Sequence, residues 1–511
     1  MNIKKIIYNI RPVFFTGLLL VLVYGCTDKL DAPFEDIALT SDVDYTQGED
    51  MILPLLGAYY GLYTRAWEEP ITLGIRGDDV NAAGDQVPMQ EQDAFKYQAS
   101  QWNLNSVWQL HYNDIINVFT SIEEINKYRP YANDDALADQ YIAECKVIRA
   151  YLYLNLARTF GGCIVIDDLA DIQNTPVSNK SQVMQYIVDQ MNEAIPDLPA
   201  VRPNERTDIK GGMTRFTAYA IQAIAYQEME NYQGVADATA AIIGSGRFQL
   251  YPDYYYLFKT AGKLNDENIL EFQYSDFGAG EGDRFAFQFA PFGIGGWTPV
   301  VDGADGGWGF YEPTMKYIEF MLGRGDSIRL ETSVIFTPDG ITALQNDYSG
   351  TIPSWISNTN REGDVFNNNV RLKFGSGKHI QPSTELIPGR SAMGSNKNFI
   401  VIRYAEILLM YAEALTRGAA SNIAMTDVQA VNEVRVRAGL DQLNSVTTQT
   451  VLDEKFAELA MEWGKRYYDM VRTKNTGELT QPGKTFTMDK AYYPFPADQV
   501  SELPQLKDGI Q

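Results

Sequence analysis

Hydrophobic residues recur at helical spacing along most of this 511-residue chain. In the segment 399–415, Leu408 and Ala412 belong to one apolar stripe, while Ile407 and Tyr411 belong to a second. A helix that is apolar on two sides packs against neighbours on both of them. The pattern therefore predicts a buried helix over residues 399–415.

Two further helices are predicted after this segment. Thr426 and Gln429 have the spacing of a capping box, which predicts a helix that begins at Thr426. Gly439 is well placed to end it, because glycine accepts the left-handed conformation common after a helix. An apolar stripe from Leu452 to Met470 predicts a third helix of about five turns.

The first half of the chain shows the same helical period. Its predicted helices cover residues 51–66, 105–128, 136–160, 181–198, 214–228 and 232–243. In the first of these, Leu55, Leu56, Tyr59, Tyr60 and Tyr63 are predicted to face inward. Short turns between helices of this length favour antiparallel pairs, stacked in units of about 34 residues like tetratricopeptide repeats.

Two stretches interrupt the helical pattern. Residues 67–102 are dense in Asp, Asn and Gln and are predicted to form a long functional loop. Residues 276–398 hold many glycines, with one short helix expected at 315–322 and long polar loops at 335–398. We therefore expect a mainly α protein, a tetratricopeptide-like superhelix of helix pairs with a loop-rich, irregular ligand-binding subdomain. The helical regions would be 26–275 and 399–511, with the irregular subdomain between them.

The N-terminus has the pattern of a secretion signal. Residues 1–25 combine basic positions with an apolar run that is too short to span a membrane. The run closes on Tyr24, Gly25 and Cys26, which resembles a bacterial lipobox, although Tyr24 departs from the usual small residue. Cys26 is therefore the predicted lipidation site, and a two-chain lipid would anchor the protein stably. An ordinary cleaved signal with an incidental cysteine is the alternative.

Composition narrows the possible chemistry. The net charge of −24 argues against a nucleic-acid partner, because phosphate binding needs clustered Lys and Arg. With two histidines and no metal-ligand spacing, we predict no metal site and no cofactor; a structural calcium at Asp302 and Asp305 is possible but is not predicted. Cys145 and Cys163 are expected to be buried free thiols.

Catalysis has little support in the sequence. There is no nucleophile elbow, and His111 is expected to be structural while His379 is unassigned. Acidic pairs such as Asp78 and Asp79 leave a glycosidase open, but chance pairs are expected among 66 acidic residues. We therefore predict a protein that is not an enzyme.

Binding through aromatic rings has more support. Aromatic residues make up 12% of the chain, and their flat faces suit the C–H faces of sugars as well as a hydrophobic core. The candidate platforms are Trp308, Trp297, Tyr311 and Trp102, and the candidate polar partners are Asp79, Asn81, Asp85 and Arg284. A packing role is the open alternative for each tryptophan. Trp67 and Trp355 rank lower, and Trp108 and Trp463 are expected in the core.

Motifs near the C-terminus carry a family resemblance. The segments are Arg403-Tyr-Ala-Glu406, Asn432-Glu-Val-Arg435-Val-Arg437 and Glu462-Trp-Gly-Lys-Arg466-Tyr-Tyr-Asp469. Together they resemble the C-terminal signature of the SusD/RagB family, surface lipoproteins that capture nutrients, mostly glycans. Matching positions run in order from Cys26 to Leu506.

The resemblance implies a function and a location. It implies a lipid-anchored, surface-exposed protein of the outer membrane that binds an oligosaccharide or polysaccharide without catalysis. It also implies a partner, a SusC-like TonB-dependent transporter that receives the glycan. The same fold binding peptides is the alternative, followed by a surface glycosidase. The variable loops decide the ligand, so the sequence does not identify it.

Overall fold

The computed structural model describes residues 43–167, 169–275, 282–283, 285–301, 306–389 and 394–507. The predicted signal, the lipidation site Cys26, the polar partner Arg284 and the acidic pair Asp302 and Asp305 lie outside these residues. The described chain is mainly helical, as predicted.

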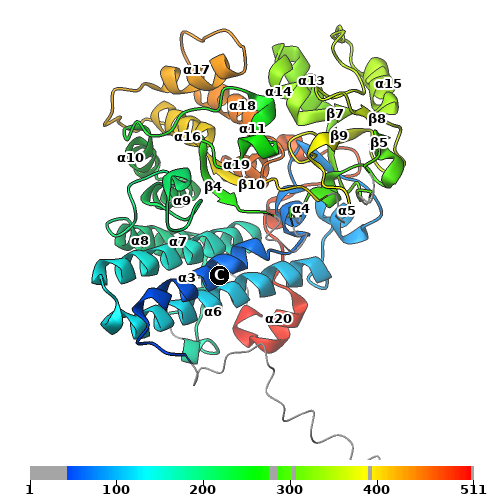
Figure 1. Ribbon diagram of the computed structural model, residues 1–511. Helices are drawn as coiled ribbons and strands as arrows, with labels where there is room; N and C mark the ends of the chain where they lie inside the picture. Colours follow the sequence, from blue (N-terminus) through cyan, green and yellow to red (C-terminus); the bar gives the residue numbers. More distant parts are fainter. Residues whose placement is uncertain are drawn as a thin grey trace, which may run out of the picture.

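A row of stacked helices forms one side of the molecule. Its members are α3 (Ile52–Tyr63), α6 (Trp102–Tyr128), α7 (Asp135–Phe160), α8 (Lys180–Ala194), α9 (Arg215–Glu228) and α10 (Tyr232–Ile243). From α6 onward each helix contacts the next one, and α10 continues the row against α16 (Tyr404–Thr416). Figure 1 shows this succession rising from α6 to α16 and α17. The predicted superhelix of helix pairs is confirmed.

Local signals fix the ends of several helices. Gly161 has a φ of 79° and caps α7, which ends at Phe160, where the predicted helix over residues 136–160 also ends. Thr426 and Gln429 form the predicted capping box of α17 (Asp427–Arg437), and Gly439 follows with a φ of 73°. Because capping depends on residues within one turn, the sequence alone locates these ends.

The prediction for α3 was wrong at two positions. Leu55 is buried as expected, but Leu56 is 42% exposed and Tyr60 is 63% exposed. The helix is apolar on several sides, and its packing against α6 and α7 covers only some of them. Periodicity alone does not tell which apolar side of such a helix is covered.

The segment 399–415 is not one helix. Phe399–Arg403 is a strand, β10, which pairs antiparallel with β4 (Asn268–Phe272), and α16 begins only at Tyr404. The β-branched run of residues 400–402 favours a strand when a partner strand is available. The partner strand lies about 130 residues earlier in the chain. Because that pairing is not visible locally, the helical stripe was the stronger signal in the sequence.

The predicted long helix between Leu452 and Met470 is also broken. It consists of α18 (Thr448–Leu459) and α19 (Lys465–Arg472). Between them Met461, Trp463 and Gly464 all have positive φ values, of 68°, 55° and 71°. A Cβ atom on Gly464 would lie 2.4 Å from the carbonyl oxygen of Leu73, so glycine permits a close crossing with α4 (Glu69–Gly74).

The two irregular stretches contain more regular structure than predicted. The first holds α4, β1 (Val80–Ala82) and α5 (Val87–Asp93). The second holds α12 (Ala286–Phe289), β5 (Trp297–Thr298), β6 (Tyr311–Pro313), α13 (Met315–Arg324), α14 (Ser327–Ser333), β7 (Val334–Phe336), α15 (Pro338–Asp347), β8 (Val365–Phe366) and β9 (Phe374–Ser376). The expectation of long loops over residues 335–398 was therefore wrong in part, since this segment contains α15 and the strands β8 and β9, which pair with β5 and β7.

The motif residues of the C-terminal signature form a buried ionic network. The Arg403 guanidinium donates to Glu267 Oε1 at 3.0 Å and to Glu462 Oε2 at 2.9 Å, and it also pairs with Glu458. Burial by itself raises the pKa of Glu458, but the guanidinium groups of Arg437 and Arg403 outweigh it and hold the pKa at about 2. These residues join β10 to β4 and α18, so these signature residues lie in the interior of the fold.

Other interior predictions are confirmed. Cys145 and Cys163 are free and buried, and Trp108 and Trp463 lie in the core. His111 is buried, and its Nδ1–H donates to the Val107 carbonyl at 2.7 Å, which is a structural role. None of the helices in the described part of the chain has the length and apolar character of a membrane span.

Candidate functional site

Three tryptophans from distant segments meet at the edge between the helical row and the loop-rich side. The ring centroid of Trp67 lies 5.9 Å from that of Trp102 and 5.3 Å from that of Trp308. Trp102, the first residue of α6, is 45% exposed, and Trp308 is 41% exposed. We call Trp67, Trp102, Phe287 and Trp308 the aromatic platform.

The surrounding structure holds the platform rings in place. Phe287 packs edge-on against Trp308 at 4.5 Å, and Phe310 supports the same ring from the core at 5.5 Å. The backbone N–H of Trp308 donates to the Phe287 carbonyl at 2.7 Å, and the side-chain amide of Gln288 donates to the backbone carbonyl of Trp67. The rings are therefore oriented before any ligand arrives, which lowers the entropy cost of binding.

Arg371 forms a polar edge beside the platform. One guanidinium nitrogen donates to the Trp308 carbonyl at 2.7 Å, and another pairs with Asp85 at 2.5 Å. The guanidinium carbon also lies 3.7 Å from the ring centroid of Phe292, a side chain that is 40% exposed. The structure thus brings the predicted residues Trp308, Trp102 and Asp85 to one surface.

Three other predicted site residues lie in the interior. Trp297 is 5% exposed and packs against Phe366 across the β5–β8 pair. The Tyr311 hydroxyl donates to the Met461 carbonyl at 3.2 Å, and the Asp79 carboxylate accepts from the Met461 N–H at 2.6 Å. Both contacts are made at the break between α18 and α19. The prediction that these three side chains are available to a ligand was wrong. Segments far away in the sequence bury them, and the residues around them do not reveal this.

Asn81 lies apart from the platform, in the wall of a neighbouring cavity. Its side-chain oxygen accepts from Lys484 Nζ at 2.7 Å. The cavity has a volume of about 420 Å³ and is bordered by β1, β6, α15 and residues 369–374, including Arg371. Arg371 therefore borders the cavity and also contacts Trp308 of the platform.

Sequence reasoning missed several members of this surface. Trp67 was ranked low, and Phe287, Phe292 and Arg371 were not singled out. Trp67 comes between α3 and α4, and Arg371 comes from a segment almost 300 residues away from Asp85. Aromatic residues next to glycines were an available sequence signal for Phe292 and Trp308, but no local pattern pairs them with Trp67.

A second, apolar pocket of about 470 Å³ lies elsewhere. Its walls come from α3, residues 209–213 and β4, and they include the exposed side chains of Leu56 and Tyr60. Its polar wall groups Glu271 and Tyr59 are already bonded to Leu264 and Glu144. None of the platform residues borders it, so it is a separate feature.

The chemistry of the platform is suited to binding. Its exposed faces are flat and apolar, and its edge offers the guanidinium of Arg371 and the carboxylate of Asp85. Flat rings flanked by planar polar groups match ligands that have both apolar faces and hydroxyl groups. Within the described ranges, no group of three or more His, Cys, Asp or Glu residues is arranged to hold a metal ion.

Family models match both halves of the chain. The model of the SusD family matches residues 244–506, and a model described as starch-binding associating with outer membrane matches residues 35–226. A SusD-like protein of Bacteroides ovatus is 23% identical over 80% of this chain and 73% of that protein. SusD-like protein P2 of Formosa agariphila is 24% identical, and the match covers 92% of each chain.

Solved structures share the fold. Surface glycan-binding protein A from Bacteroides uniformis matches with a TM-score of 0.73 at 22% identity, over 89% of this chain and 98% of that one. The protein of that name from Bacteroides thetaiotaomicron, in complex with laminarihexaose, matches with a TM-score of 0.70 at 20% identity, over 90% and 98%. The SusD family model alone matches just over half of the residues of this chain, and the chain therefore belongs to the SusD family.

Proposed function

We propose that this protein binds a nutrient glycan at the aromatic platform without catalysis. The observation that carries the proposal is the pair of half-exposed rings, Trp102 and Trp308, which both pack against Trp67. Sugar rings present C–H faces to such planes, and their hydroxyl groups pair with carboxylates and guanidinium groups such as Asp85 and Arg371. Burying one indole face contributes roughly 2 kcal/mol, so two faces support affinities of about millimolar to micromolar.

The family supports the rest of the proposal. One structural neighbour of this chain is a laminarin-binding SusD-like protein, and another was solved in complex with laminarihexaose. A matching family model is described as associating with the outer membrane. We therefore propose a surface-exposed lipoprotein, anchored through Cys26, that passes an oligosaccharide to a SusC-like TonB-dependent transporter. Weak, reversible capture suits a receptor that must release its cargo.

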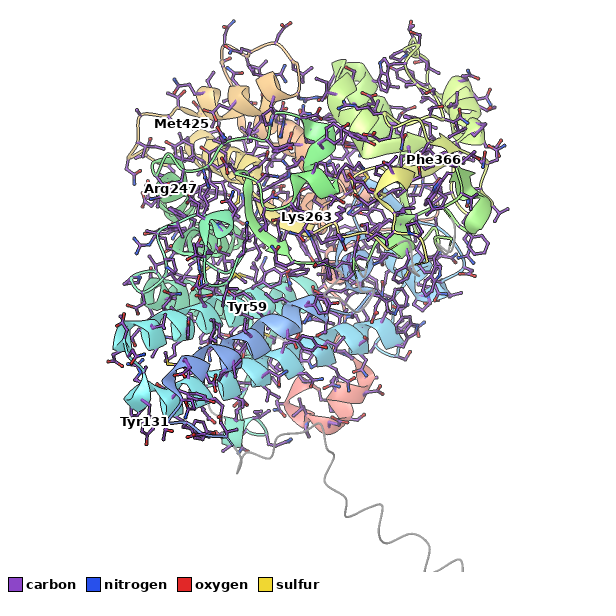
Figure 2. The ribbon with its side chains drawn as sticks, in the orientation of Figure 1. Tyr59, Tyr131, Arg247, Lys263, Phe366 and Met425 are labelled. Carbon is purple, nitrogen blue, oxygen red and sulfur yellow. The ribbon has the colours of Figure 1, made fainter. Side chains whose placement is uncertain are left out.

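The platform is tested by removing one exposed ring. Trp308→Ala is expected to weaken retention in a gel that contains the bound polysaccharide, with a loss of about tenfold in affinity. The measurement is affinity electrophoresis against a polysaccharide panel, with protein that lacks residues 1–26. Tyr131→Ala is the matched control, because Tyr131 is also an exposed aromatic residue and lies at the far corner of the molecule from Phe366 and the loop-rich side (Figure 2).

Three outcomes decide between functions. Equal retention of the Trp308→Ala variant and the wild type would remove Trp308 from the site. Retention by none of the polysaccharides, together with heat release on titration of peptides, would replace the glycan with a peptide. Release of shorter products from the panel over several hours would show a glycosidase.

A further inference from the structure

The cavity next to the platform is lined by amide, carboxylate and cationic side chains, together with apolar ones such as Met315 and Leu372. Asn81, Asp339, Asp347 and Asn369 line it together with Lys373, and its volume is about 420 Å³. Small-molecule sites in proteins span about 300–1,000 Å³, so this cavity has room for a ligand. Its polar walls suit a hydroxyl-rich ligand better than an apolar one.

The segment of residues 367–371, which we call the ridge, connects the cavity to the platform: residues 369–371 line the cavity, and Arg371 contacts Trp308. Three consecutive asparagines fix it through their side chains. The amide of Asn367 donates to the Gly295 carbonyl, and the amide of Asn369 donates to the Phe292 carbonyl, both at 2.9 Å. These side-chain hydrogen bonds therefore hold the ridge in a defined conformation.

The opposite side of the ridge is bonded to α15. The Asn368 amide donates to Asp339 Oδ1 at 2.9 Å, and the Asp339 N–H donates back to Asn368 Oδ1 at 2.8 Å. At the end of the ridge, Arg371 borders the cavity and also donates to the Trp308 carbonyl of the platform. Platform, ridge and cavity are thus joined by direct contacts and form one continuous surface.

The charges around the cavity favour one class of sugar. Glu312, Asp339 and Asp347 contribute carboxylates, while the guanidinium of Arg371 is already paired with Asp85. Lys373 remains as the opposing charge on the wall, so the carboxylates outnumber the available cations. A uronate or sulfate group would meet net repulsion there, whereas uncharged hydroxyl groups can pair with the carboxylates and amides.

We propose that this cavity is a second sugar subsite, and that the protein selects uncharged oligosaccharides long enough to reach from Trp308 across the ridge. The proposal rests on the proposed function, because it assigns the glycan a class and a minimum length. A chain that occupies both subsites gains from linked binding, since the second contact becomes intramolecular. Affinity should therefore increase with chain length until both subsites are filled.

The length dependence is tested by calorimetry. The probes are short and long fragments of the uncharged polysaccharide that retains the wild type in the gels, with laminaritriose, laminarihexaose and laminarin included from the start. Wild-type protein is expected to bind the long fragments about tenfold more tightly than the short ones. Ala343→Leu, which narrows the cavity from α15, is expected to bring the two affinities within about threefold and to leave short fragments unaffected.

Gln345→Leu is the matched control, since it makes a comparable substitution at an exposed position of the same helix outside the cavity. If Ala343→Leu retains the full length dependence while Trp308→Ala loses binding, the second subsite is wrong and the proposed function stands. If the wild type binds no glycan, the proposed function fails and this proposal fails with it.

The charge preference has its own test. Wild-type protein should be retained by uncharged polysaccharides and not by polygalacturonate. Asp347→Lys should increase retention by polygalacturonate, because it converts a repelling wall group into an attracting one. Equal retention of the wild type by polygalacturonate and by the uncharged polysaccharides would overturn the assignment to uncharged sugars.

Discussion

At the scale of single residues, side chains of the same type occupy opposite environments, as two tryptophans show. The Trp463 indole N–H donates to the Ile400 carbonyl at 2.8 Å, and its ring packs in the core. The Trp308 ring is 41% exposed and is held by backbone contacts beside Arg371. The contacts around each residue decide whether a tryptophan is buried in the core or exposed at the platform.

Asp79 supports a prediction about pH. Burial raises the pKa of Asp79 to about 6, and although the Met461 N–H favours the charged form, Asp78 adds repulsion. A carboxyl group whose pKa is raised in the native state stabilises the fold when protonated. That contribution is lost as pH rises from about 4 through about 6. Asp79→Asn avoids this loss because the amide does not titrate. The difference in free energy of unfolding, variant minus wild type, should therefore increase by on the order of 2 kcal/mol between pH 4 and pH 7.5.

Urea denaturation at the two pH values measures this difference. Asp347→Asn is the control, because Asp347 is exposed on α15 and its substitution should have the same small effect at both pH values. A stability difference for Asp79→Asn that does not change with pH would contradict the assigned titration.

At the scale of elements, the break between α18 and α19 organises the centre of the molecule. It places Met461 against Asp79 and Tyr311, and it brings Gly464 against the end of α4. An unbroken helix would carry none of these crossings. The loop-rich side is therefore positioned by a turn in the C-terminal region, far from it in sequence.

The close crossing at Gly464 predicts a large effect of one methyl group. Gly464→Ala adds a Cβ atom 2.4 Å from the Leu73 carbonyl oxygen at a φ of 71°. We expect a loss of at least about 3 kcal/mol in the free energy of unfolding, measured by chemical denaturation. Gly483→Ala separates strain from collision, because Gly483 has a φ of 87° in open space and should lose only about 1 kcal/mol. Equal losses for both variants would show that the crossing is not tight.

At the scale of the whole molecule, the N-terminal and C-terminal helical regions are interlocked. Strand β4 pairs with β10, and Glu267 next to it is bonded to Arg403 and Arg437. Near the C-terminus, the Tyr493 hydroxyl donates to the Thr72 carbonyl at 2.9 Å. The boundaries drawn from sequence at residues 275 and 399 therefore divide one continuous core.

This interlocking predicts that the N-terminal helical region does not fold alone. A fragment of residues 26–275 would leave Glu267 without its arginine partners and β4 without its partner strand. We expect no cooperative thermal transition by circular dichroism for this fragment. Coexpression with residues 276–511 should restore one, with the intact chain as reference. A cooperative transition in the isolated fragment would show that the region is a separate folding unit.

The sequence by itself determined the features that depend on neighbours within a few residues. The helical period located α6 to α10, and capping residues such as Thr426 and Gly161 located helix ends. The order of signature motifs also indicated the family before any contact was known. These signals are local because a helix forms its hydrogen bonds between residues four apart.

The tertiary structure alone decided which side chains reach the surface together. It brought Trp67 and Trp102 to Trp308, turned residues 399–403 into a strand, and covered Asp79 with the α18–α19 break. Exposure and pairing depend on segments that lie tens to hundreds of residues away. A single sequence carries no local trace of those contacts, so the aromatic platform became recognisable only in three dimensions.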